Sequence, residues 1–254
     1  MVMKLTSGSQ HKLRQALWSP VYSDVLEILN GSSNAHTLAP MGDDYHGKLN
    51  AADFTGRRFH ASGLEPTWTL SSALSAWDTP PSYEGPKSIP VITFNGSDEH
   101  LHTPDNALWT RALGAMTISA WIWTSPDAAN GWRAIMTKYD GASDEFEWAV
   151  QVQDNSDYIF FICYDKDAAS NASIQTVSDA AVPTSQWAQV VCTYDGSANA
   201  TGMNIYINGG LVASTDTDDA NFVSMRDTTE RVAIGSLLSG GSPTSFFGEK
   251  MAGG

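Results

Sequence analysis

The sequence contains few cysteines, and this limits the kinds of site that it can build. Its 254 residues include two, Cys163 and Cys192, and each lies within an apolar run typical of a strand. We expect two buried thiols, although a disulfide between strands stays open because the sequence does not reveal its geometry. The chain has no Cys-x-x-Cys motif and no Cys/His cluster, so a zinc site is not expected.

Basic residues are also scarce. The chain has 14 Lys and Arg against 28 Asp and Glu, a formal net charge of −14 at pH 7. A protein that binds nucleic acid needs a basic surface to displace the counterions of the phosphates. The nearest approach to a basic run is Arg57-Arg58. We therefore expect neither nucleic acid nor an anionic membrane surface as a partner.

Long apolar runs are absent as well. No stretch of the sequence is long enough to cross a bilayer, and its first ten residues, MVMKLTSGSQ, lack the apolar core of a signal peptide. We expect no membrane insertion. The predicted location is extracellular or on the surface of a virus particle, reached without a recognisable signal peptide, and a cytoplasmic location stays open.

Aromatic residues are plentiful, and short β-type runs dominate the second part of the chain. Nine Trp can supply the filling of a large core. Several runs are separated by Asp-Gly or Asn-Gly pairs, which favour tight reversals. Together they predict an all-β antiparallel sandwich or barrel. The runs cover residues 116–123, 145–152, 158–164, 173–177, 187–194, 203–208, 211–215 and 231–235.

The first part of the chain has a different pattern. Residues 10–18 place apolar side chains at helical spacing and end before Pro20, which predicts a short helix. The remainder is irregular and contains a Pro-rich connection near residues 80–86. We predict an N-terminal extension or linker over residues 1–88, which is also a candidate arm for homo-oligomer or particle assembly, and a β-sandwich over residues 89–254.

Five segments, in this order, resemble one known family: ITFNGSDEHL, MTISAWIW, AIMTKYDG, FEWAVQV and SQWAQVVCTYDGSANATGMNIYINGGLVA. They resemble laminin-G-like domains of the concanavalin A-like lectin/glucanase group, in the form seen in phage structural and environmental bacterial proteins. The resemblance covers about residues 89–248, and residues 43–50 are similar to the family's first strand. It implies a jelly roll of two antiparallel sheets.

The resemblance also carries an expectation about the end of the sandwich. In similar proteins the chain continues past the segment FFGEKMAGG into another strand, which pairs beside the strand that corresponds to residues 91–94. The sequence stops at Gly254. We therefore expect the sandwich to be cut short, with an open edge at that place.

Catalytic residues are sought first in the segment SDEFEW, residues 143–148. Jelly-roll glucanases carry a Glu-x-Asp-x-Glu motif, and here Glu145 and Glu147 would share one strand face, opposite Phe146 and Trp148. Two such carboxylates are candidates for an acid and a nucleophile. Ser143 breaks the motif, however, so a solvated strand face is the favoured interpretation and catalysis the weaker one.

Metal ligands are sought next, because the resemblance implies Ca²⁺ on rim loops. Calcium needs six to eight oxygen ligands from several segments, and no loop here has EF-hand spacing. Solvated acidic loops are the favoured interpretation, and Ca²⁺ is the one cofactor that the sequence suggests. His100 and His102 are an alternative pair for a transition metal, or ordinary loop residues. The weak calcium candidates are Asp98, Asp216, Asp218 and Asp219.

Sugar-binding residues are sought among the aromatics, since sugar rings stack on exposed rings. Trp132 follows a Gly-containing loop and is the best exposed candidate, and Tyr139 and Asp140 at the next turn are expected nearby. Three other Trp lie inside the family's core motifs and are expected to pack in the core instead: Trp121, Trp148 and Trp187.

These observations favour a non-catalytic recognition or structural module, displayed on a virion or cell surface, that binds glycan or a neighbouring protein. A second hypothesis is a glycan-active enzyme, a hydrolase or lyase, on the same fold. A third is a purely architectural subunit that oligomerises through residues 1–88.

Overall fold

The computed structural model describes residues 69–70, 92–107, 109–125, 131–143, 145–165 and 172–252. The helix predicted at residues 10–18, the first strand predicted at 43–50 and the connection at 80–86 lie outside these residues. From the N-terminal extension the structure describes one short strand, β1 (Thr69–Leu70), which pairs antiparallel with β3 (Leu101–Thr103).

The described residues form two sheets, and the larger has ten strands. Its main path runs β1-β3-β13-β5-β6-β7-β8-β12, and the hairpin β14–β15 attaches to β5. Neighbours along the main path are antiparallel, as predicted. The bounds are β13 (Val232–Ile234), β5 (Arg133–Asp140), β6 (Glu145–Val152), β7 (Tyr158–Asp165), β8 (Ala172–Ala181), β12 (Ser214–Asp218), β14 (Leu237–Ser239) and β15 (Ser242–Thr244).

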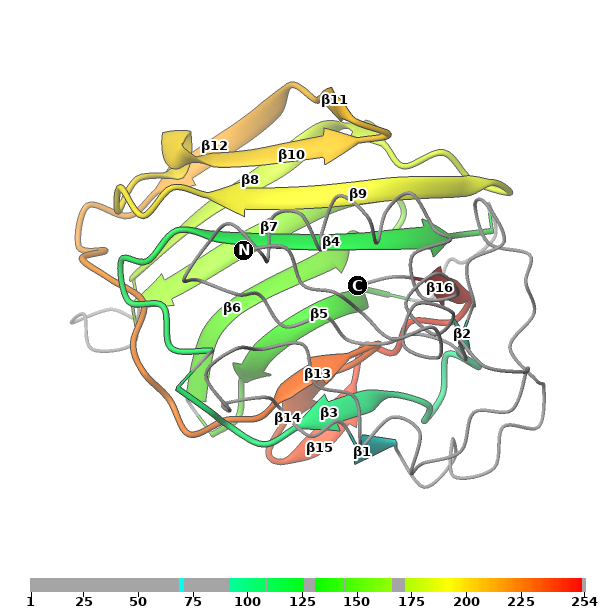
Figure 1. The fold of residues 1–254 in the computed structure, drawn as a ribbon, viewed down its shortest axis with the longest axis horizontal. Helices are drawn as coiled ribbons and strands as arrows, with labels where there is room; N and C mark the ends of the chain where they lie inside the picture. The colour runs from blue at the N-terminus through cyan, green and yellow to red at the C-terminus, as the bar shows by residue number, and fades with distance from the viewer. Residues whose placement is uncertain are drawn as a thin grey trace, which may run out of the picture.

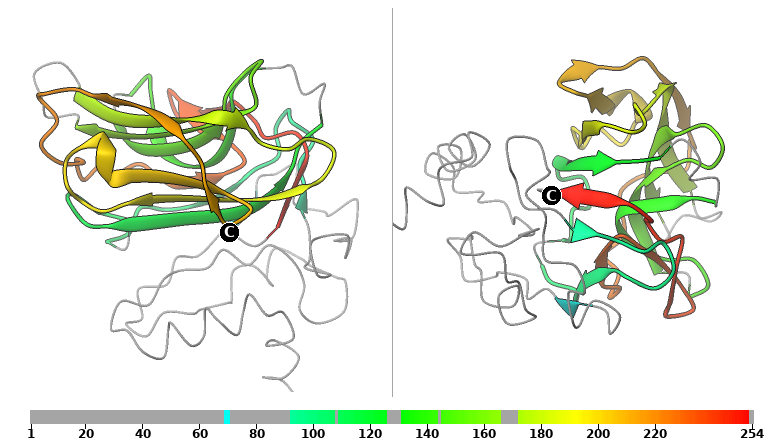
Figure 2. Two further views of the ribbon diagram at one scale, coloured as in Figure 1. Left: turned by 90° about the horizontal axis from the view of Figure 1, so that it is seen from above. Right: turned by 90° about the vertical axis from the view of Figure 1, so that its right-hand side faces the viewer.

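The smaller sheet runs β11-β10-β9-β4-β16-β2. The two sheets lie face to face, with the smaller in front of the larger in Figure 1 and the two seen edge-on in Figure 2. A short 3₁₀ helix, η3 (Ala200–Gly202), leads into β10. The bounds are β11 (Gly210–Leu211), β10 (Met203–Ile207), β9 (Trp187–Tyr194), β4 (Met116–Trp123), β16 (Lys250–Ala252) and β2 (Ile92–Thr93).

The core fills the space between the sheets, because alternate side chains of each strand point inward. In β4 the buried residues are Ile118, Ala120 and Ile122, while the residues between them face the other way and are only partly buried or exposed. Both cysteines are buried and free, so the prediction of two buried thiols is confirmed. Trp148 lies in the core as expected, whereas Trp121 and Trp187 pack instead against Ala252.

A strand does pair beside residues 92–93, but it lies within the segment FFGEKMAGG, so the further strand that the resemblance implies beyond this segment stays a prediction. β16 pairs antiparallel with β2 on one side and with β4 on the other. Met251 is fully buried in the core, and the Asn95-Gly96 corner lies against the end of the chain, since a Cβ at Gly96 would stand 2.9 Å from the Cα of Gly248. Among the described residues β2 is the last strand on this side of the sheet. The strand β16 itself was not predicted, because three residues are too short a run to be recognised as a strand from sequence.

A β-bulge in β6 corrects a second expectation. Lys138 and Tyr139 are adjacent in β5, yet they pair with Trp148 and Phe146, so Glu147 is an extra residue in β6. The bulge interrupts the alternation of side chains. Phe146 therefore leaves the core that Trp148 belongs to, and its ring stacks on Tyr139 instead.

The described part of the chain contains no helix that is both long and apolar enough to cross a membrane.

Candidate functional site

Trp132 is an exposed aromatic side chain on the larger sheet. It immediately precedes β5 and has 37% of its surface exposed, which is high for so large an apolar residue. Its ring packs edge-on against Phe160 of β7, with 5.0 Å between ring centroids. Phe160 lies between two core residues, Ile159 and Phe161, and so points away from the core. The pair thus forms an aromatic surface on the outer face of the sheet.

Gln151 lies next to this aromatic pair. It is the cross-strand partner of Phe160 and of Ala134, and side chains opposite each other in a sheet share a face. The residue is only 6% exposed, and its amide Nε2 has no hydrogen-bond partner. A buried amide donor without an acceptor is costly, and because Nε2 has almost no exposed surface, an oxygen of a bound molecule reaches it only after the side chains around it shift.

The loops around Trp132 are held by charged side chains. Asp154, in the β6–β7 turn, accepts a hydrogen bond from the backbone N–H of Gly131 at 3.2 Å. Asp157, in the same turn, pairs with Arg133, whose side chain is almost fully buried. These contacts fix the residues on both sides of Trp132, so its ring is presented from an ordered support. We call Trp132, Phe160 and Gln151 the aromatic site.

Tyr139 and Asp140 do not join the aromatic site. Trp132 and Tyr139 stand at opposite ends of β5, seven residues apart, which is roughly 23 Å at the usual rise per residue. Tyr139 instead clusters with Phe146 and Tyr164, at centroid distances of 5.3 and 5.7 Å. The expectation that the next turn would lie near Trp132 is wrong, because that turn follows a full-length strand.

Asp140 is a structural residue of the turn. It is buried, and its carboxylate accepts hydrogen bonds from the backbone N–H groups of Ala142, Ser143, Gly240 and Gly241 and from the Ser143 hydroxyl. Burial alone would raise the pKa of Asp140, but these hydrogen bonds outweigh it and hold the pKa below its ordinary value. Its oxygens are occupied by protein donors, so they have little capacity left for a ligand.

Glu145 and Glu147 both contact residues 226–229, but their surroundings differ. Glu145 is partly exposed, accepts a hydrogen bond from the N–H of Thr229 at 3.2 Å and lies 3.9 Å from Arg226. Glu147 is fully buried, and one of its oxygens, Oε1, accepts the N–H and the hydroxyl of Thr228 at 2.6 and 2.9 Å. The expectation of a solvated face is wrong at Glu147, since the chain around Thr228 covers it.

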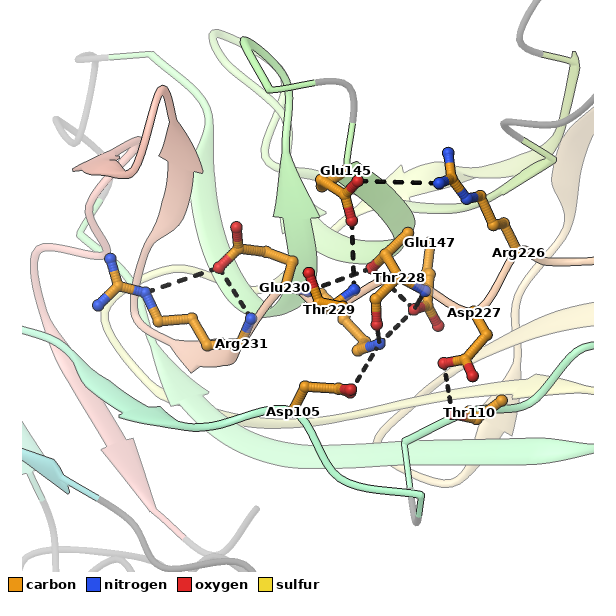
Figure 3. A network of polar contacts seen from close by, with 11 residues as sticks. Asp105, Thr110, Glu145, Glu147, Arg226, Asp227, Thr228, Thr229, Glu230 and Arg231 are labelled. Carbon is orange, nitrogen blue, oxygen red and sulfur yellow. Dashed lines mark hydrogen bonds and ion pairs between the residues drawn. The ribbon is translucent and has the colours of Figure 1, made fainter.

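Glu147 also belongs to a buried ionic cluster with Lys138. Figure 3 shows Asp105, Glu147 and Thr228 converging on one nitrogen, which is Nζ of Lys138. This ammonium donates to Glu147 Oε1 and to the carbonyl of Thr228 at 2.7 Å, and it forms an ion pair with Asp105 Oδ1 at 3.0 Å. Burial raises the pKa of Glu147, although its hydrogen bonds from Lys138 and Thr228 oppose the rise.

The two glutamates do not form the acid and nucleophile of a glycosidase. Such an enzyme needs two carboxyl groups that flank the bond to be cleaved, and both must touch the sugar. Glu147 has no exposed surface and makes its contacts with Lys138 and Thr228. The cluster therefore closes one end of the sandwich and leaves a sugar no access to the second carboxyl group.

Each of the four calcium candidates accepts hydrogen bonds from different protein groups. Asp98 accepts the side-chain amide of Asn95 at 2.8 Å, within a turn in which Asn95 Oδ1 accepts the N–H groups of residues 97–99. Asp216 accepts the hydroxyl of Thr176, Asp218 accepts the N–H of Ala200, and Asp219 accepts the N–H and amide of Asn221. Binding of Ca²⁺ stays a prediction.

His100 and His102 share a face, with stacked rings 5.6 Å apart. Burial lowers the pKa of both rings, that of His102 to about 4 with added repulsion from Arg231. Over the residues that the structure describes, no group of three or more His, Cys, Asp or Glu side chains is placed to hold a metal ion. The pair therefore lacks a third ligand within this part of the chain.

The sequence did not single out the residues that complete the aromatic site and the ionic cluster around Lys138. Gln151 carries a signal, because it is a polar residue between two valines of β6, whereas Lys138 stands among other polar residues of β5 and carries none. Phe160 carries none, since a run such as FFICY does not show which ring faces outward. Asp105 carries none either, because its contact with Lys138 joins segments 33 residues apart, 138 against 105.

Comparison with known families gives a match over residues 95–248, to a laminin-G-type model described as the concanavalin A-like lectin/glucanases superfamily. No curated protein matches the sequence. The matched range covers more than half of the chain and includes the aromatic site and the glutamates of β6.

Comparison with solved structures gives likenesses to binding domains of botulinum neurotoxins and to a module of a sialidase. The botulinum neurotoxin serotype G binding domain has 13% identity and a TM-score of 0.51, over 75% of this chain and 42% of that chain. The serotype D binding domain has 14% identity and a TM-score of 0.52, over 88% and 47%. The Ruminococcus gnavus sialidase module CBM40, bound to alpha2,3 sialyllactose, has 18% identity and a TM-score of 0.41, over 54% and 73%. At these identities the likeness is one of fold, and the chain spans less than half of each neurotoxin domain.

Proposed function

Since the chain belongs to the laminin-G-type branch of the concanavalin A-like lectin/glucanases superfamily, we propose that it is a non-catalytic module that binds carbohydrate through the aromatic site. The proposal keeps Trp132 from the sequence prediction and replaces Tyr139 and Asp140 with Phe160 and Gln151. The neurotoxin domains of similar fold are themselves described as binding domains.

The observation that carries the proposal is the pairing of an exposed ring with an unsatisfied amide. A sugar offers an apolar C–H face, which stacks on a ring such as that of Trp132, and hydroxyl oxygens, which accept hydrogen bonds from a donor such as Gln151 Nε2. Phe160 supports the Trp132 ring edge-on and limits its rotation, so less conformational entropy is lost on binding.

The enzyme hypothesis has less support. A retaining or inverting glycosidase needs two accessible carboxyl groups, whereas Glu147 is enclosed and Glu145 is held by Thr229 and Arg226. Display on a virion or cell surface, and assembly through residues 1–88, stay part of the proposal, because the extension apart from β1 lies outside the described residues.

The test is a glycan array followed by titration calorimetry with the best oligosaccharide. We expect Trp132→Ala to weaken binding about tenfold or more, which is about 1.4 kcal/mol of lost stacking and contact. Gln151→Met keeps the volume of the side chain and removes the amide, so it should weaken binding as well. Thermal melts check that both variants stay folded.

Val223→Ala is the matched control, since Val223 is 67% exposed and lies outside the aromatic site. It should bind as the unchanged protein does. Full affinity in folded Trp132→Ala protein would show that this site does not bind the glycan, and an array without any hit would refute carbohydrate binding.

A further inference from the structure

Lys138 is a fully buried amine with two carboxyl groups beside it. Its Nζ lies 3.0 Å from Asp105 Oδ1 and donates to Glu147 Oε1 and to the carbonyl of Thr228. The ammonium thus has three oxygen atoms around it, two that accept its hydrogen bonds and one that forms an ion pair with it. Neither the fold nor the proposed binding of carbohydrate requires such a cluster, because β5 and β6 are already joined by their backbone ladder.

The surroundings of Lys138 are apolar. Its cross-strand neighbours are Trp148 on β6 and Val232 on β13, and both are buried in the main core. Water is therefore largely excluded from Nζ, and charges held there lose their hydration at a large cost in free energy. A reaction that removes a positive and a negative charge together is favoured in such a place.

We propose that Lys138 and Asp105 are joined by an intramolecular isopeptide bond, formed with Glu147 as the group that moves the protons. The bond would connect Nζ of Lys138 to Cγ of Asp105, and so tie the segment that follows β3 to strand β5. It is a self-modification and needs no oxidant, reductant, metal or second protein.

The step balances in atoms and charge. The ammonium of Lys138 first gives a proton to the carboxylate of Glu147, which leaves a neutral amine with a free electron pair. This pair attacks Cγ of Asp105, the new N–C bond forms, and a C–O bond of the carboxyl group breaks. Glu147 passes the first proton to an oxygen of the Asp105 carboxyl group, then takes the second proton from nitrogen and delivers it to the same oxygen, which leaves as water. One ammonium and one carboxylate become one neutral amide and one water molecule.

The contact between the reacting groups favours this condensation over the same reaction in bulk water. There an amine and a carboxylic acid form a stable ion pair, whereas groups held in contact react with effective concentrations of about 10⁵ M or more. Glu147 Oε2 is buried and has no hydrogen-bond partner, so it has a lone pair free to take a proton. The side chain of Asp105 is 30% exposed, which gives the released water a path to solvent.

The test is the mass of the full chain, measured after denaturation. We expect the folded and purified protein to be lighter by one water molecule than its sequence requires. Tryptic digestion should show no cleavage after Lys138 and should yield one branched peptide that contains Lys138 and Asp105. The full calculated mass in the unchanged protein, with normal cleavage after Lys138, would overturn the proposal, as would a water loss that maps to other residues.

Variants separate the roles of the three side chains. Lys138→Met and Asp105→Ala should each show the full mass calculated for their sequences, and Glu147→Gln should show the full mass or a water loss that develops slowly. Asp157→Ala is the matched control, because it removes the ion pair with Arg133 at the other end of β5 and should leave the water loss unchanged. The mass of the unchanged protein decides the question even where a variant does not fold.

Discussion

Asp140 shows how a single buried carboxylate organises this protein at the scale of residues. Its two oxygens join the turn after β5 to the turn between β14 and β15, through N–H groups of Ser143, Gly240 and Gly241 among others. Hydrogen bonds to a charged acceptor are the stronger ones, and the Asp140 carboxylate is buried, so it stabilises both turns at once. Gly240 and Gly241 have positive φ angles, 62° and 75°, a backbone conformation that residues with a Cβ atom rarely adopt.

We expect Asp140→Asn to lower the free energy of unfolding by about 2–4 kcal/mol, because it replaces a charged acceptor with a neutral amide that offers one oxygen. Urea titration measures the change. Asp98→Asn is the control, since Asp98 is exposed and bonds within its own turn, and its effect should stay within about 0.5 kcal/mol. Similar effects of the two substitutions would contradict the role of Asp140.

The pH dependence of the same variant follows from the lowered pKa of Asp140. A carboxyl group whose pKa is lower in the folded than in the unfolded state stabilises the fold above the unfolded value of about 3.9, and this contribution disappears as the pH falls through the folded pKa. The stability difference between the unchanged protein and Asp140→Asn should therefore be constant near neutral pH and shrink below about pH 4.

At the scale of elements, the hairpin of β10 and β11 is the clearest case of turn chemistry. Tyr206 pairs with Leu211 and Ile207 with Gly210, so the loop consists of the two residues between them, Asn208 and Gly209. Both have positive φ angles, 53° and 79°. Two such residues form the reversal whose twist matches that of the strands, and Asn-Gly is the preferred pair for it.

We expect Gly209→Ala to destabilise the protein by about 1 kcal/mol, which is the usual cost of the left-handed conformation for a residue with a Cβ atom. A Cβ at Gly209 would meet no atom within 4 Å, so the cost is conformational and not steric. Gly210→Ala is the matched control, because Gly210 lies in a strand without a positive φ angle and has ordinary contacts. Thermal unfolding should separate the two variants, and equal melting temperatures would refute the explanation.

At the scale of the whole molecule, the two sheets protect a core that neither could form alone. Cys163 on β7 and Cys192 on β9 belong to different sheets, and both are fully buried in the same cluster. Burial raises the pKa of both thiols, because a thiolate loses its hydration there, and the neighbouring Cys192 adds to the rise at Cys163. Reagents that need a thiolate reach these residues only when the sheets separate.

We expect neither thiol to react with Ellman's reagent at neutral pH in the folded protein, and both to react in concentrated urea. The rate at intermediate urea concentrations should follow global unfolding measured by circular dichroism, since no smaller opening exposes the space between the sheets. Fast reaction of one thiol without loss of circular dichroism would show that the sandwich opens locally.

Much of the fold could be predicted from the sequence, because strands and turns are encoded by near neighbours. The runs at residues 116–123, 145–152 and 187–194 became β4, β6 and β9 with the predicted bounds. The exposure of Trp132 was also predictable, since it follows a Gly-containing loop. A family match over residues 95–248 agrees with the resemblance of the motifs.

The arrangement of the sites could not be predicted, because it depends on contacts between distant segments. Asp105 reaches Lys138 across strand β13, which comes far later in the chain. Gln151 lies opposite Phe160, the ring that contacts Trp132, through the pairing of β6 with β7. β16 was missed because its three residues are stabilised by β2 and β4 and not by a pattern of their own. Glu147 was placed on the wrong surface because a bulge changes the alternation without a sequence signal.

The sequence by itself determined that this chain is an antiparallel β-protein with Asn-Gly and Asp-Gly turns and a strong excess of acidic residues, because periodicity, turn residues and charge are local properties. Only the tertiary structure decided which side chains meet: Trp132 with Phe160, and Lys138 with Asp105 and Glu147. The physical reason is that register, bulges and strand order are set by the packing of the whole core, and a shift of one residue in any strand would send these side chains to the opposite face.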